Sequence, residues 1–152
     1  MKLAEALQER ADLNRNIEQL KARLLNNVLA QEGERTAEDP EALKRELDGA
    51  VERLAFLMAR INLTNSRVFL DGQTLTELIA KKDALSLKIH TCKDIVYTAS
   101  QTAYRARNTE IRIQSTIPVA DWQAEIDGMA RELRLLDNQL QACNWTTELI
   151  EE

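Results

Sequence analysis

Apolar residues recur at alternating intervals of three and four between residues 119 and 143, over more than three heptads without a break. The positions are Val119, Trp122, Ile126, Met129, Leu133, Leu136, Leu140 and Cys143. This spacing places all of them along one face of an α-helix, and so regular a repeat is typical of helices that pack as coiled coils. A chain that contains this segment must therefore cover one long apolar helix face.

Three earlier segments show the same pattern, and we expect helices over about residues 2–31, 40–61 and 75–107. Asp39 before Pro40 is a helix-start signal. Only 4 of the 152 residues are glycine, which argues against sandwiches and barrels. The sequence predicts an all-α fold, an elongated antiparallel four-helix bundle with coiled-coil-like heptads, as one domain over residues 1–152.

Two short connectors, about residues 67–71 and 110–117, are expected to be extended. Val68-Phe69-Leu70 leads into a turn at Asp71-Gly72, and isoleucines alternate with polar residues in the second connector. The connectors would lie at opposite ends of the helix over 75–107, so they cannot pair within one straight-helix bundle. Because isolated short strands are unstable, we expect them to pair between subunits, which predicts a homo-oligomer.

The charges divide by segment within a chain of net charge −5. Residues 75–107 hold six basic and three acidic residues, a net of +3, whereas residues 32–62 carry −3 and residues 108–152 carry −6. We interpret this division as complementary packing, either within the bundle or across an interface. The acidic balance argues against a nucleic-acid-binding protein.

No apolar run approaches the roughly 20 residues of a membrane-spanning helix, and the first residues lack the apolar core of a signal peptide. We therefore expect a cytoplasmic protein that does not enter a membrane. Cys92 and Cys143 both fall on apolar helical positions, and we expect them to be reduced core thiols.

The residues offer little for catalysis, and we expect no enzyme, no cofactor and no metal site. The single histidine, His90, lies four residues before Asp94, which predicts a local surface ion pair on one helix face. A di-iron bundle needs two histidines in Glu-x-x-His motifs, so that class is excluded. We find no phosphate-binding loop, no dinucleotide fingerprint and no serine in a glycine-flanked elbow.

Two polar clusters are candidate ligand sites. Arg105, Arg107 and Arg112 follow the helix over 75–107 and could bind a carboxylate or phosphate. The alternative is that they pair with acidic residues of this chain. A second cluster, Asn62, Asn65 and Arg67, follows the preceding helix, and there the alternative is local capping and turn hydrogen bonds.

Three stretches of the chain resemble one family of bacterial proteins. They are Met1-Lys2-Leu3-Ala4-Glu5-Ala6-Leu7 with Arg10-Ala11-Asp12-Leu13, then Asp71-Gly72-Gln73-Thr74-Leu75, and finally Asn144-Trp145-Thr146-Thr147-Glu148-Leu149. The family is the septicolysin-like group of small bacterial proteins of unknown function. The resemblance covers nearly the whole chain and implies an all-helical fold and a bacterial origin. It implies no established activity and no catalytic residues.

These observations favour a non-enzymatic, cytoplasmic, homo-oligomeric protein that acts through protein–protein contacts as an interaction or scaffold protein. Another helical protein is a possible further partner. Two alternatives remain open at this point. One is a pore-forming, haemolytic toxin, as the septicolysin-like label suggests. The other is an anion-binding protein or enzyme that uses the cluster of Arg105, Arg107 and Arg112.

Overall fold

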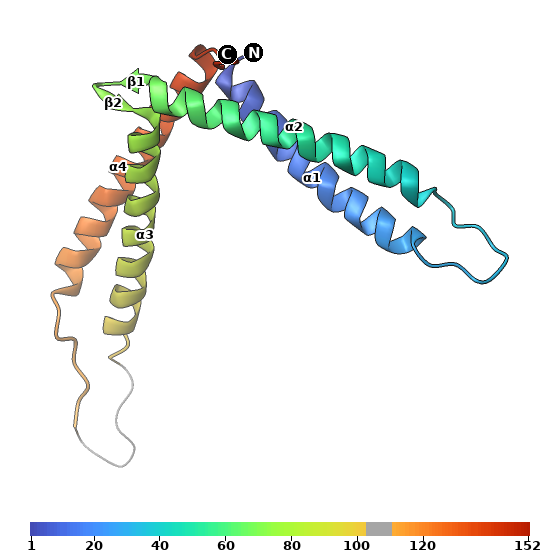
Figure 1. The fold of residues 1–152 in the computed structure, drawn as a ribbon. Coiled ribbons are helices and arrows are strands. Elements are labelled where there is room, and N and C mark those ends of the chain that lie inside the picture. Colours follow the sequence, from blue (N-terminus) through green and yellow to red (C-terminus); the bar gives the residue numbers. More distant parts are fainter. Residues whose placement is uncertain (103–110) are drawn as a thin grey trace. The chain divides into compact units, whose positions relative to one another are not determined.

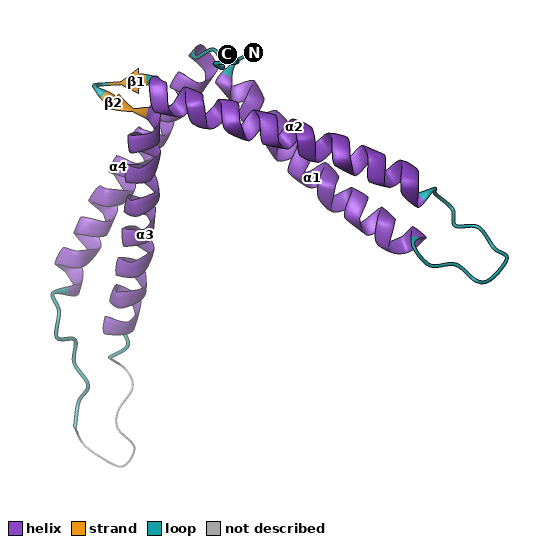
Figure 2. Cartoon of the chain, viewed as in Figure 1, coloured by secondary structure: helices purple, strands orange, loops and turns teal. Residues whose placement is uncertain are grey.

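The computed structural model describes residues 1–102 and 111–152 and contains four long helices (Figures 1 and 2). They are α1 (Leu3–Asn27), α2 (Pro40–Arg67), α3 (Leu75–Ala99) and α4 (Val119–Thr146). The prediction of an all-α, four-helix fold is confirmed. The contacts between residues divide the chain into two compact units. The first unit consists of Met1–Leu70 and Cys143–Glu152, and the second consists of Asp71–Ala142. The expectation of one domain over residues 1–152 stays a prediction.

In the first unit, α1 and α2 form a helical hairpin (Figure 1). Each helix buries its apolar face. Leu3, Leu20, Leu57 and Ile61 are at most 1% exposed. They lie on the seams that the spacing of three and four predicts, because only one face of each helix can be covered by its neighbour. Two ion pairs flank this core: Arg53 donates to Glu9 at 2.6 and 2.9 Å, and Arg23 pairs with Glu38.

Helix α1 ends at Asn27, four residues before the predicted end near residue 31. The buried Asn27 side chain donates to the Arg23 carbonyl at 2.7 Å and accepts the backbone N–H of Glu38 at 2.9 Å. This amide therefore ends the helix and holds the following loop. Helix α2 begins as predicted, with Asp39 accepting the backbone N–H of Glu41 at 3.1 Å and Pro40 in the first turn.

The two ends of the chain meet within the first unit, which the sequence pattern did not indicate. The Leu3 N–H donates to the Thr147 carbonyl at 2.9 Å, and the Leu149 N–H donates to the Met1 carbonyl at 2.8 Å. Leu149 is 7% exposed. The Ile150 N–H donates to the Thr64 hydroxyl at 2.9 Å, and that hydroxyl donates to the Arg60 carbonyl at 2.8 Å. The C-terminal tail is thus packed onto α1 and α2.

In the second unit, α3 and α4 share a core centred on Ile89, Val96 and Ile126. Around these residues pack other members of the predicted seams: Leu85, Cys92, Val119, Trp122, Met129 and Leu133. Lys81 pairs with Glu132 at 3.5 Å, and Lys82, which interrupts the α3 seam, pairs with Asp137 at 2.5 Å. The complementary packing of basic and acidic segments is therefore confirmed within this helix pair.

The predicted connectors need two corrections. Helix α2 continues through Arg67 instead of ending near Ile61. The extended piece within 67–71 is real, but it pairs locally, as β1 (Phe69–Leu70) with β2 (Gln73–Thr74). Asp71 and Gly72 both have positive φ values, 51° and 82°, as a tight two-residue hairpin turn requires.

The second connector is not a strand. Over the described residues 111–117 the chain is coil and bend, and Ser115 exchanges hydrogen bonds with the backbone of Ile117. Because β1 finds its partner locally and 111–117 forms no ladder, strand pairing between subunits is no longer required. Helix α3 also ends at Ala99, not near Arg107, where the Ser100 hydroxyl donates to the Val96 carbonyl at 2.7 Å.

The hydroxyl of Thr64 offers a test of the tail attachment. We expect Thr64→Val to lower the free energy of unfolding by about 1–3 kcal/mol, because the Ile150 N–H would lose its acceptor at a fully buried site. Urea denaturation followed by circular dichroism measures the change. Thr91→Val is the matched control, since exposed Thr91 makes the same bond to a carbonyl four residues back, at 2.9 Å to Leu87, without holding a tail. An equal loss in both variants would contradict the assignment.

The Glu9–Arg53 pair predicts a pH dependence. The hydrogen bond from Arg53 lowers the pKa of Glu9, with desolvation opposing it in part. A carboxyl whose pKa is lower in the folded state stabilises the fold at pH values above its unfolded pKa of about 4.3, and that contribution disappears as the pH falls through the folded value. We expect Glu9→Gln to be less stable than the parent at pH 7 and equal to it in stronger acid. The free energy of unfolding, measured at several pH values, checks this, with the exposed Glu18→Gln as the control. A stability difference between Glu9→Gln and the parent that persists in acid would contradict a role for the ionised Glu9–Arg53 pair.

Candidate functional site

The predicted cluster of Asn62, Asn65 and Arg67 lies on the last turns of α2 and not in a loop. Asn62 and Arg67 are exposed, and Asn65 is half-buried. No hydrogen bond or ion pair joins the three within residues 1–102 and 111–152. Arg67 suits this position because a cation in the last turn offsets the negative end of the helix dipole. The structure therefore does not assemble these residues into a binding site.

The predicted arginine cluster is only partly visible. Arg105 and Arg107 lie outside the described residues. Arg112 is exposed and makes no ion pair with any described part of the chain. It directly precedes Ile113, which lines a hollow in the second unit.

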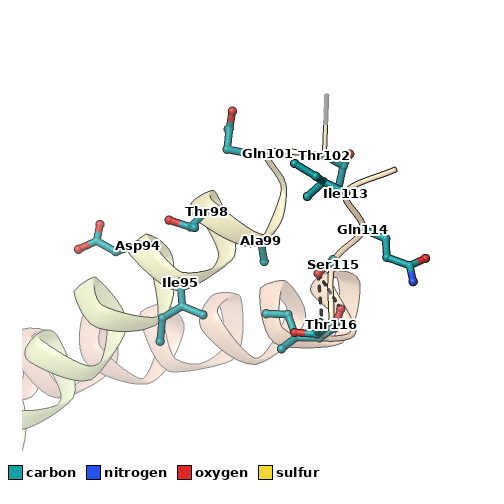
Figure 3. Close-up of a pocket in the computed structure, with 11 residues that line it drawn as sticks. Asp94, Ile95, Thr98, Ala99, Gln101, Thr102, Ile113, Gln114, Ser115 and Thr116 are labelled. Carbon is teal, nitrogen blue, oxygen red and sulfur yellow. Dashed lines mark hydrogen bonds between the residues drawn. The ribbon is translucent and has the colours of Figure 1, made fainter. Parts of the chain in front are cut away.

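This hollow, called here the apolar hollow, lies between the C-terminal turns of α3 and residues 113–117 (Figure 3). Its volume is about 500 Å³. The apolar lining comes from Ile95 and Ala99 on one side and from Ile113 and Ile117 on the other. Ile95 is 41% exposed and Ile113 is 46% exposed, so both apolar side chains stand open to solvent. Asp94 contributes the one ionisable side chain among the described lining residues.

A second recess, called here the basic groove, runs between α3 and α4 and has a volume of about 400 Å³. Helix α3 contributes Lys82, Ser86, His90 and Lys93, and α4 contributes Arg134 and Asp137. Ile89, Ala130 and Leu133 complete the lining. The sequence contains a signal for this groove: polar residues recur at intervals of three and four beside the apolar seam of each helix.

The predicted ion pair between His90 and Asp94 does not form, since the structure shows no contact of that kind between them. The two side chains belong to different recesses: His90 lines the basic groove and Asp94 lines the apolar hollow. Side chains four residues apart are neighbours on a helix. In this structure, however, His90 and Asp94 line different recesses and do not form an ion pair.

Within the described ranges, no group of three or more His, Cys, Asp or Glu side chains is arranged to hold a metal ion. Cys92 and Cys143 are both free thiols, half-buried as members of their seams. Among the described helices, none has the length and apolarity needed to span a bilayer.

Comparison with known proteins places the chain in a family. Residues 10–149 match a family described as "Family of unknown function (DUF6847)". The fold is similar to a crystal structure of a functionally unknown conserved protein from Corynebacterium diphtheriae, with a TM-score of 0.92, 34% sequence identity and 99% of each chain covered. No curated protein matches the sequence. None of these findings supports the septicolysin-like label. The chain belongs to the family of unknown function DUF6847.

Proposed function

We propose that this chain is a non-enzymatic protein that acts through protein–protein contacts in the cytoplasm, and that its partner at the apolar hollow is a second copy of itself. The observation that carries the proposal is the open apolar lining of this hollow, with Ile95 and Ile113 each more than two-fifths exposed. Apolar side chains gathered in a recess, with polar residues around them, are typical of an interface core.

The chemistry of the lining favours contact over catalysis. Threonine, glutamine and serine side chains surround the four apolar residues, and Asp94 is the lone ionisable group among the described lining residues. A general acid–base reaction needs a titratable group together with a second group that orients or activates it. A patch of isoleucine and alanine rimmed by hydroxyl and amide groups instead suits a shape-complementary partner surface.

A second copy is the occupant that the charges favour. Asp94 lines the hollow from α3, and exposed Arg112, which is not itself a lining residue, directly precedes the lining residue Ile113 in the chain. A two-fold interface apposes the same patch from both subunits, so each acid can face the base of the other copy. One acid and one base across a shared apolar patch form such a self-complementary set.

The first test is the solution mass, measured by light scattering coupled to gel filtration at several concentrations. We expect twice the chain mass of 17.3 kDa, and we expect Ile113→Glu to raise the dissociation constant at least tenfold by placing a charge in the interface core. Leu87→Lys is the control, because Leu87 is 69% exposed on α3 but does not line the hollow. A parent chain of 17.3 kDa at every concentration, or equal weakening by both variants, would contradict the proposal.

The charge pair has its own test. Asp94→Arg and Arg112→Asp should each weaken the dimer by apposing like charges, and the double variant should restore it, because the two charges are then exchanged. The dissociation constants of all four proteins are compared by sedimentation at one ionic strength. A double variant as weak as the single variants would show that Asp94 and Arg112 do not face each other.

A further inference from the structure

We infer that the basic groove between α3 and α4 is a binding site for a small phosphate monoester that carries an apolar group. The inference does not depend on the dimer, because all residues of the groove come from one helix pair of one chain. It rests on the unpaired cations that line the groove from both helices and on the apolar residues of the same lining.

The lining of the groove carries an excess of positive charge. Lys82 pairs with Asp137 at 2.5 Å. Lys93 and Arg134 make no ion pair within residues 1–102 and 111–152, in contrast to Lys81, which pairs with Glu132. Three cationic side chains against one carboxylate leave the lining at +2 before His90 is counted. This local excess occurs in a chain of net charge −5.

Donor side chains line the groove from both helices. Ser86, His90 and Lys93 are spaced by four and three residues, so they lie on one flank of α3. Arg134 lies across the groove on α4. A guanidinium fork, an ammonium, a hydroxyl and an imidazole can together donate to the several oxygens of one phosphate group. A dianionic phosphate also matches the +2 charge better than a single carboxylate does.

The groove contains more than an anion site. Ala130 and Leu133, both half-buried, form an apolar strip beside the cationic side chains, above the buried core residue Ile89. A volume of about 400 Å³ lies in the range of small-molecule sites, which combine apolar walls with a few polar groups. A ligand that uses both parts has a phosphate head and an apolar body.

Phenyl phosphate is a suitable probe, titrated into the ¹⁵N-labelled protein in a buffer free of phosphate. We expect saturable amide shifts confined to about residues 82–93 and 130–137. Lys93→Ala and Arg134→Ala should each weaken binding about tenfold, the loss expected for one charge-assisted hydrogen bond. Lys88→Ala on α3 and Arg131→Ala on α4 are matched controls, because each removes the same exposed side chain from outside the groove lining.

Several results would overturn the inference. Equal weakening by the control variants would mean that overall charge, not the groove, attracts the anion. Shifts that do not saturate, or that lie elsewhere, would show that the groove is not the site. If inorganic phosphate binds as tightly as phenyl phosphate, the apolar strip does not contribute to binding and the ligand needs no apolar group. The solution mass of each variant, measured in parallel, separates loss of ligand from any change in self-association.

Discussion

The whole structure depends on each helix having its apolar face covered by the helix that is its partner in the hairpin. Helices of 25 to 28 residues gain little stability from propensity alone in water, so burial of one face provides most of it. Leu20 and Leu57 in the first unit, and Ile126 in the second, are at most 1% exposed for this reason.

Polar contacts fix details that the apolar seams leave open. Apolar burial has no direction, and two helices with similar seams can slide along each other by a turn. Buried groups with one acceptable partner remove that freedom: the Asn27 amide holds the loop before α2, and the Thr64 hydroxyl holds the tail at Ile150. Between α3 and α4, the partly exposed ion pair Lys82–Asp137 joins one residue of each helix. Each of these contacts joins a particular residue of one segment to a particular residue of another.

The two recesses of the second unit share a helix and differ in chemistry. Ile95 follows Ser86 by nine residues, two and a half helical turns, so these two lining residues lie on opposite sides of α3. An apolar recess at one side can be covered by a protein surface while a cationic groove at the other remains open to solvent. The two proposals are thus compatible, and contact with a partner could be combined with recognition of a small anion.

Much of this fold could be predicted from the sequence, because heptad spacing and helix-start residues act over a few neighbouring positions. Four helices, their buried faces and the start of α2 at Asp39-Pro40 follow from such local rules. The pairing of basic with acidic segments follows from counts of charge. The predictions that were wrong have a common cause. They concern the ends of α1, α2 and α3 and the conformation of residues 111–117, which depend on hydrogen bonds to particular backbone groups. Only the tertiary structure decided that Ile150 reaches Thr64 and that Arg134 of α4 lines the same groove as His90 and Lys93 of α3, because each of these placements joins segments far apart in the chain.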